Sequence, residues 1–173
     1  MDNNYIFQYW EAIQNGTVTV GKWIKTIYEI LVNGLKSGKW DFDEEKANKA
    51  INFIENFCHH SEGRNDLLKL ELWQKAIVSA IFGIMDKRTG YRQFREVFIV
   101  VARKNGKTLF AAAIAAYMAY IDGEYGAKVY FLAPKLDQAD LVYDAFYQIV
   151  QADDELDSIT TVSYTHLDAA DEL

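Results

Sequence analysis

Apolar residues recur at helical spacing through most of the first 84 residues, with short polar breaks between the periodic runs. The pattern predicts helices over Tyr5–Ile13 and Val20–Leu35, a third that follows the acidic run Asp41–Glu45, and a fourth that begins at Leu72. The polar stretch Ser61–Asp66 is the clearest break and predicts a domain boundary. In the second helix, the apolar positions with helical spacing are Val20, Trp23, Ile24, Ile27, Leu31 and Leu35. The chain is therefore expected to begin with a helical segment.

The pattern changes near residue 96. From there on, short continuous apolar runs alternate with segments whose apolar residues have helical spacing. Glu96–Ala102 is a nearly continuous apolar run rich in Val and Ile, as in strands buried on both faces of a sheet, and Ala127–Ala133 is a second apolar run. Between them, Lys107–Asp122 is rich in Ala and contains no Gly or Pro, which predicts a helix. Pro134 ends the second run and begins another helical pattern. This order predicts an α/β fold with a parallel sheet and right-handed crossovers.

The segment between the first predicted strand and its helix has the composition of a phosphate-binding loop. Backbone N–H groups of Asn105, Gly106, Lys107 and Thr108 would face an anion at the positive end of a helix. Lys107 can reach the β- and γ-phosphates, and the Thr108 hydroxyl can bind Mg²⁺. The full Walker A pattern is not met, because Val101 stands where the first glycine belongs. The alternative is a surface turn that contains Gly-Lys by chance.

Other polar residues near this loop have two interpretations each. Arg103 can contact a γ-phosphate with two hydrogen bonds and Lys104 adds positive charge, or both are solvated loop cations. The Gln74 amide can pair with the adenine edge, or it is an ordinary solvated helix residue. Lys135 and Gln138 follow the second predicted strand, where they either contact nucleic acid or begin a helix. The sequence leaves these alternatives open.

Composition narrows the class of protein. The 173 residues carry a net charge of −7, so the chain lacks a broad basic surface and any contact with DNA must be local. The single cysteine, Cys58, excludes an internal disulfide, and no apolar run is long enough to span a bilayer. Cys58-His59-His60 suggests a metal site, but no second cluster has ligand spacing, and histidines near a helix end also suit the helix dipole. A soluble cytoplasmic protein is expected.

Several ordered motifs give the chain, up to about residue 155, a likeness to a known family. They are Gly21-Lys22-Trp23, Phe42-Asp43, Phe53-Ile54-Glu55, Leu72-Trp73-Gln74, the run Ala102-Arg103-Lys104-Asn105-Gly106-Lys107-Thr108, Asp122-Gly123-Glu124, and Val129–Asp140. The chain resembles the N-terminal part of the large terminase subunit of tailed bacteriophages. That family characteristically lacks the first Walker glycine and keeps an arginine in the loop, so the resemblance explains Val101 and Arg103.

The resemblance implies a P-loop ATPase domain of the additional-strand catalytic-glutamate class, followed by a nuclease domain. Arg103 and Lys107 would be catalytic, Gln74 would contact adenine, and residues 103–108 would bind ATP, with Mg²⁺ on Thr108. The family uses ATP to move viral double-stranded DNA through a portal into the capsid, together with a small terminase subunit. A homo-oligomeric motor in the cytoplasm of an infected bacterial host, with no membrane partner, is the implied setting.

The predicted organisation is a helical segment over 1–65, the first part of a P-loop ATPase domain over 66–155, and a suspect tail over 156–173. The Walker B aspartate and the catalytic glutamate are missing, because no apolar run after Gln151 ends in Asp-Glu. The chain is therefore expected to be a fragment that is inactive alone. Two alternatives remain: a fragment of another P-loop translocase or helicase, and a non-catalytic module that docks a partner, which exposed Tyr5, Tyr9 and Trp10 would favour.

Overall fold

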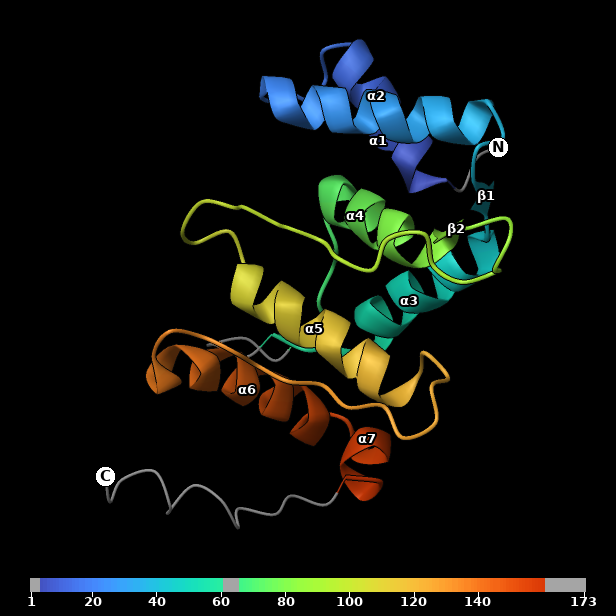
Figure 1. The fold of residues 1–173 in the computed structure, drawn as a ribbon. Helices are drawn as coiled ribbons and strands as arrows, with labels where there is room; N and C mark the ends of the chain where they lie inside the picture. The colour runs from blue at the N-terminus through green and yellow to red at the C-terminus, as the bar shows by residue number, and fades with distance from the viewer. Residues whose placement is uncertain (1–3, 61–65, 161–173) are drawn as a thin grey trace.

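The computed structural model describes residues 4–60 and 66–160, which form a stack of helices joined by long extended segments (Figure 1). The elements are α1 (Tyr5–Gln14), α2 (Lys22–Lys36), β1 (Asp41–Phe42), α3 (Glu44–Phe57), α4 (Leu72–Gly83), β2 (Ile84–Met85), α5 (Lys107–Tyr120), α6 (Leu136–Gln151) and α7 (Asp154–Ser158). In Figure 1, α1 and α2 lie at one end of the molecule, and α6 and α7 lie at the other.

Several helices begin where the sequence offers a side chain for the free N–H groups of the first turn. The Oδ1 atom of Asn4 accepts a hydrogen bond from the Ile6 N–H at 3.0 Å, which caps α1. The Oδ1 atom of Asp43 accepts from the Lys46 N–H at 2.9 Å and caps α3. The predicted helix positions are confirmed in all four N-terminal cases, because capping and apolar spacing are local properties of the chain.

The face that α2 buries differs from the predicted apolar stripe. Tyr28, Leu31 and Val32 are buried, and the Tyr28 ring packs edge to face on Tyr9 of α1 with centroids 4.7 Å apart. Trp23 is 74% exposed, and Ile24, Ile27 and Ile30 are exposed as well. The apolar stripe of the helix is wider than the face that α1 covers, so spacing alone did not reveal which of its residues are buried.

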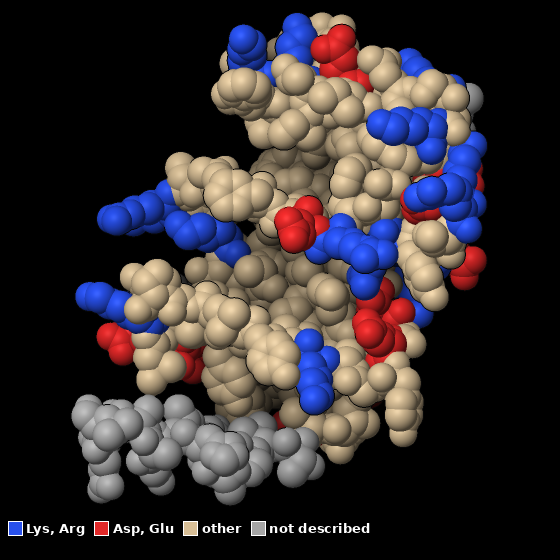
Figure 2. Space-filling view, viewed as in Figure 1, with Lys and Arg blue, Asp and Glu red and all other residues tan. Residues whose placement is uncertain are grey.

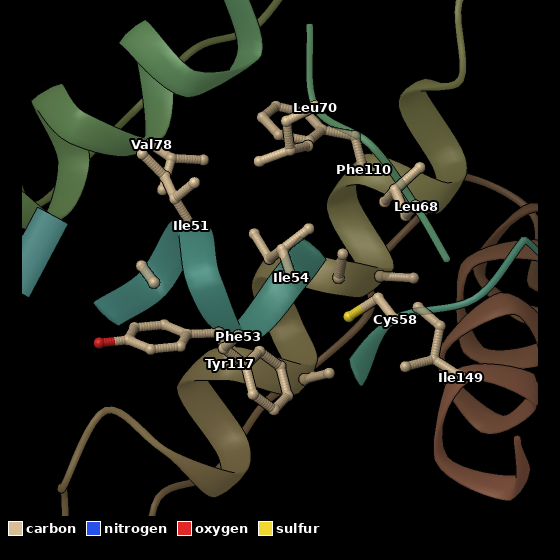
Figure 3. Close-up of a cluster of buried hydrophobic side chains, with 14 of the residues drawn as sticks. Ile51, Phe53, Ile54, Cys58, Leu68, Leu70, Val78, Phe110, Tyr117 and Ile149 are labelled. Carbon is tan, nitrogen blue, oxygen red and sulfur yellow. The ribbon is translucent and has the colours of Figure 1, made fainter. Parts of the chain in front are cut away.

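The main core lies where α3, α4, α5 and α6 meet (Figure 3). Ile54 from α3 and Val78 from α4 are completely buried, and Phe110 and Ile149 bring α5 and α6 into the same cluster. A half-buried ion pair fixes the edge of this core, since Lys75 Nζ lies 3.0 Å from Glu55 Oε2. The other oxygen of Glu55 accepts the Leu70 N–H at 2.9 Å, which ties the segment before α4 to α3.

The two strands predicted at 96–102 and 127–133 are not paired in a sheet. The sheet within the described residues has two short antiparallel strands, β1 and β2, which pair Asp41 with Met85 and Phe42 with Ile84. The parallel sheet of the predicted fold is therefore not seen, although both helices that should follow its strands are present. A strand exists only through hydrogen bonds to a neighbour, and neither segment has such a neighbour in the described parts of the chain.

Two further predictions concern residues outside the described ranges. The boundary at Ser61–Asp66 falls almost wholly on residues 61–65, and most of the suspect tail falls on 161–173. The division into 1–65, 66–155 and 156–173 therefore stays a prediction.

Candidate phosphate-binding site

The loop that leads into α5 has the backbone that a phosphate site requires. Gly106 is the N-cap of α5 and has φ 65°, in the left-handed region where glycine is favoured. Lys104 also has a φ of 65°. No side chain caps α5, so the first N–H groups of the helix, including those of Lys107 and Thr108, are open to an external anion.

The loop is strongly cationic for a chain with net negative charge. Arg103, Lys104 and Lys107 are exposed, and none of them forms an ion pair with an acid within residues 4–60 and 66–160. Lys and Arg side chains project at the tip of this loop in Figure 2. The positive charges add to the field of the helix N-terminus, so the arrangement favours a multiply charged anion such as a polyphosphate.

The loop opens onto a cavity of about 1680 Å³, visible as a hollow in Figure 2. Its polar rim includes Arg103, Lys104, Lys107 and Thr108. The rest of its lining is largely apolar, with Ile99, Ile114 and Val142 among the lining residues. The cavity exceeds the roughly 300–1,000 Å³ of typical small-molecule sites. A nucleotide can therefore enter it and leave much of the apolar lining uncovered.

Trp73 and Gln74 are neighbours in α4, but they occupy different environments. Gln74 is 7% exposed, and its Oε1 accepts the Glu71 N–H at 2.8 Å in a capping box that begins α4. It does not line the cavity. Trp73 does, and its ring packs against Phe110 of α5 with centroids 5.9 Å apart. The predicted contact between Gln74 and adenine stays a prediction, whereas Trp73 and Ile81 are the α4 residues that line the cavity.

The remaining candidate residues are distributed unevenly around the cavity. Gln138 lines it, whereas Lys135 does not. Arg92 and Arg95 also line it, although neither was among the candidate residues taken from the sequence. The signal that could have found them is the density of basic residues over 87–95. Asp122 Oδ2 lies 3.0 Å from Arg92 Nη1, so this ion pair links the segment after α5 to the segment after β2.

The cysteine lies away from this site. Cys58 is completely buried in the main core, as Figure 3 shows, and burial followed by the nearby Asp153 charge raises the pKa of its thiol to about 12. The thiol is thus protonated at neutral pH and is a poor nucleophile. Within the described residues, no helix has the length and apolarity needed to cross a bilayer, and no three His, Cys, Asp or Glu side chains form a metal-binding group.

Comparisons with known proteins identify the family. Residues 72–165, more than half of the chain, match the family described as "Terminase large subunit, ATPase domain". Among solved structures, the large terminase of bacteriophage HK97 matches with a TM-score of 0.58 and 25% sequence identity, over 69% of this chain and 23% of that one. This chain thus spans less than a quarter of that protein's length. No curated protein matches. The chain belongs to the terminase large subunit family, and residues 72–165 match its ATPase domain.

Proposed function

We propose that the loop Arg103–Thr108 binds the phosphates of Mg²⁺-ATP, and that the chain is part of an ATP-driven DNA-packaging motor. The observation that carries this proposal is the uncapped start of α5, which three unpaired cationic side chains surround at the mouth of the large cavity. Backbone N–H groups at a helix N-terminus, together with the helix dipole, are sufficient to form an anion-binding site. Membership in the terminase large subunit family supports ATP as the source of that anion.

Several residues of the loop would contact different parts of Mg²⁺-ATP. Lys107 would neutralise the β- and γ-phosphates, and the Thr108 hydroxyl would bind the Mg²⁺ that bridges them. Arg103 would stabilise the charge that develops on the γ-phosphate, since a guanidinium donates two parallel hydrogen bonds to phosphate oxygens. Trp73 at the cavity wall is placed to pack against the base, and Gln74 would contact the adenine edge if its capping bond to Glu71 opened.

Hydrolysis is proposed for a longer parent protein. Phosphoryl transfer to water needs a carboxylate for Mg²⁺ and a glutamate to orient the water. Among the described residues, the acidic residue that lines the cavity is Asp144 of α6, and no glutamate lines it. In that parent, segments 96–102 and 127–133 would be strands of a parallel sheet that fills the apolar part of the cavity. The motor would be homo-oligomeric in the host cytoplasm, would work with a portal and a small terminase subunit, and would move viral double-stranded DNA.

The test is a titration of the chain with a fluorescent ATP analogue and Mg²⁺. Lys107→Ala should weaken binding at least tenfold, because one charged contact to phosphate is worth about 1.5–3 kcal/mol. Lys128→Ala is the matched control, since Lys128 is exposed and lies outside the cavity. Equal loss in both variants would mean a non-specific charge effect. A folded chain that binds no nucleotide would refute the proposal for this chain.

One observation favours a partner-docking role as a second function. The aromatics first considered for it, Tyr5, Tyr9 and Trp10, are buried or half-buried. Exposed apolar side chains lie instead on α2, with Trp23 and Ile30 the most exposed at 74% and 54%. Replacement of both by Ser should leave the melting temperature of the chain nearly unchanged and should weaken assembly with the packaging partners of the parent protein.

A further inference from the structure

The loop before α5 achieves its tight path without the glycine that usually begins a Walker A motif. Val101 occupies that position, and the non-glycine residue Lys104 adopts a φ of 65°, a conformation that L side chains adopt at a cost. The loop lies at the surface, with Ala102 to Lys107 all exposed, so burial does not hold it in this form. Some interaction within the loop has to select the conformation.

The side chain of Asn105 supplies that interaction. Its Nδ2 group donates hydrogen bonds to the carbonyl oxygens of Ala102 and Arg103, both at 3.3 Å. An amide nitrogen carries two hydrogens, so one side chain can satisfy both acceptors. These two carbonyls come directly before the turn that contains Lys104 and Gly106. Among the described residues, no other side chain of 102–108 makes a hydrogen bond to this loop.

The two hydrogen bonds also help to keep carbonyl oxygens from facing a bound anion. A carbonyl oxygen that faced the site would repel a phosphate, whereas backbone N–H groups attract it. Asn105 engages the oxygens of residues 102 and 103, so they are partnered before any ligand arrives. Because the loop is then ordered in advance, less binding free energy is lost when it closes on a ligand.

We propose that Asn105 is a positioning residue, whose side chain holds the phosphate loop in its binding conformation in place of the missing first glycine. The role is distinct from contact with the nucleotide, because the side-chain N–H groups already bind carbonyls of the loop itself. The inference rests on the proposed function, namely that this loop binds the phosphates of ATP. It predicts that a donor at position 105 matters, whereas the charges of Arg103 and Lys107 act directly on the ligand.

The experiment compares Asn105→Ala, Asn105→Ser and Lys107→Ala in the full chain, with the fluorescent ATP analogue as the probe. Asn105→Ala should weaken binding about fivefold to tenfold, the effect of two modest hydrogen bonds. Asn105→Ser keeps one short donor and should recover to within about threefold of the unmodified chain. The melting temperature should stay the same in all three variants, because the loop is exposed. Rescue by Ser separates positioning from a general structural defect.

A second measurement needs no nucleotide. Backbone order parameters of residues 103–106, measured by ¹⁵N NMR relaxation, should fall in Asn105→Ala and stay unchanged in Lys107→Ala. Unchanged order parameters in Asn105→Ala, or binding of Asn105→Ala within twofold of the unmodified chain while Lys107→Ala loses binding, would overturn the role of Asn105 and leave the phosphate site intact. Lower order parameters in Asn105→Ala with no nucleotide binding by any form would instead refute the proposed function.

Discussion

Apolar residues are frequent in helices α3 and α4 and also in the extended segments 96–102 and 127–133. Only the helices contain apolar side chains that are fully buried. Ile54 and Val78 are completely buried, whereas Phe98 is 93% and Leu132 is 92% exposed. A helix satisfies its backbone hydrogen bonds from within, so it needs only a neighbouring face to pack on. A strand needs a partner for both backbone and side chains. The comparison teaches that the described residues contain a packed helical core and two apolar extended segments that remain unpaired.

The largest expected effect on stability comes from replacing a phenylalanine in the helical core, compared with replacing one in an extended segment. Phe82 is 1% exposed and packs edge to face on Tyr117 with ring centroids 4.8 Å apart, so Phe82→Ala should lower the free energy of unfolding by about 3–5 kcal/mol. Phe98→Ala in the extended segment should change it by less than about 0.5 kcal/mol. Urea denaturation followed by circular dichroism measures both. A comparable loss in Phe98→Ala would mean that segment 96–102 is packed in solution.

The next effect concerns two ion pairs in different surroundings. Glu55→Ala removes the partner of Lys75 and of the Leu70 N–H in a half-buried site, and should cost about 2–3 kcal/mol of unfolding free energy. The pair between Asp41 and Lys87 is 3.4 Å long and exposed, so Asp41→Ala should cost less than about 0.5 kcal/mol. The same urea titrations compare them. Equal costs would contradict the view that burial next to the core makes the Glu55 pair important.

A smaller effect compares two glycines with the same backbone. Gly106 and Gly90 have φ of 65° and 69°, and a Cβ at either position would meet open space. Substitution by Ala should therefore cost each about 1–2 kcal/mol through conformation alone. Only Gly106→Ala should also weaken binding of the ATP analogue, because Gly90 lies in the turn after β2. Weaker binding in Gly90→Ala would indicate that the two loops are coupled.

The smallest effect is a dependence of stability on alkaline pH. The folded pKa of Cys58 is about 12, above the ordinary thiol value, so the folded chain holds its thiol proton longer than the unfolded chain does. Stability from this group is complete below about pH 8.5 and is lost as the pH rises, by at most about 1.4 kcal/mol per pH unit.

Cys58→Ala should flatten the decline of melting temperature between pH 9 and 10. Tyr117, whose pKa burial raises to about 12, contributes to the decline only at higher pH. An unchanged slope in the variant would mean that the thiol is more accessible to solvent than its position in the core indicates.

Much of the candidate site was predictable because its signal is short in sequence. Gly106, Lys107 and Thr108 follow one another at the start of a helix, and the structure has that helix begin at Lys107. The side-chain bonds of Asn105 and the capping bond of Gln74 were not predictable, since an amide suits both a ligand and the backbone. Arg92 and Arg95 reach the cavity only because the segment after β2 folds back along α5.

The sequence by itself determined the helices and the backbone of the candidate phosphate-binding loop, because helical spacing, caps and a glycine at positive φ act over a few residues. Tertiary structure decided which face of α2 is buried, that Trp73 rather than Gln74 meets the cavity, and that segments 96–102 and 127–133 stay unpaired. Those outcomes depend on contacts between residues far apart in the chain. An apolar run indicates that its side chains need a neighbouring segment to pack against. Whether such a segment lies beside it depends on the tertiary fold.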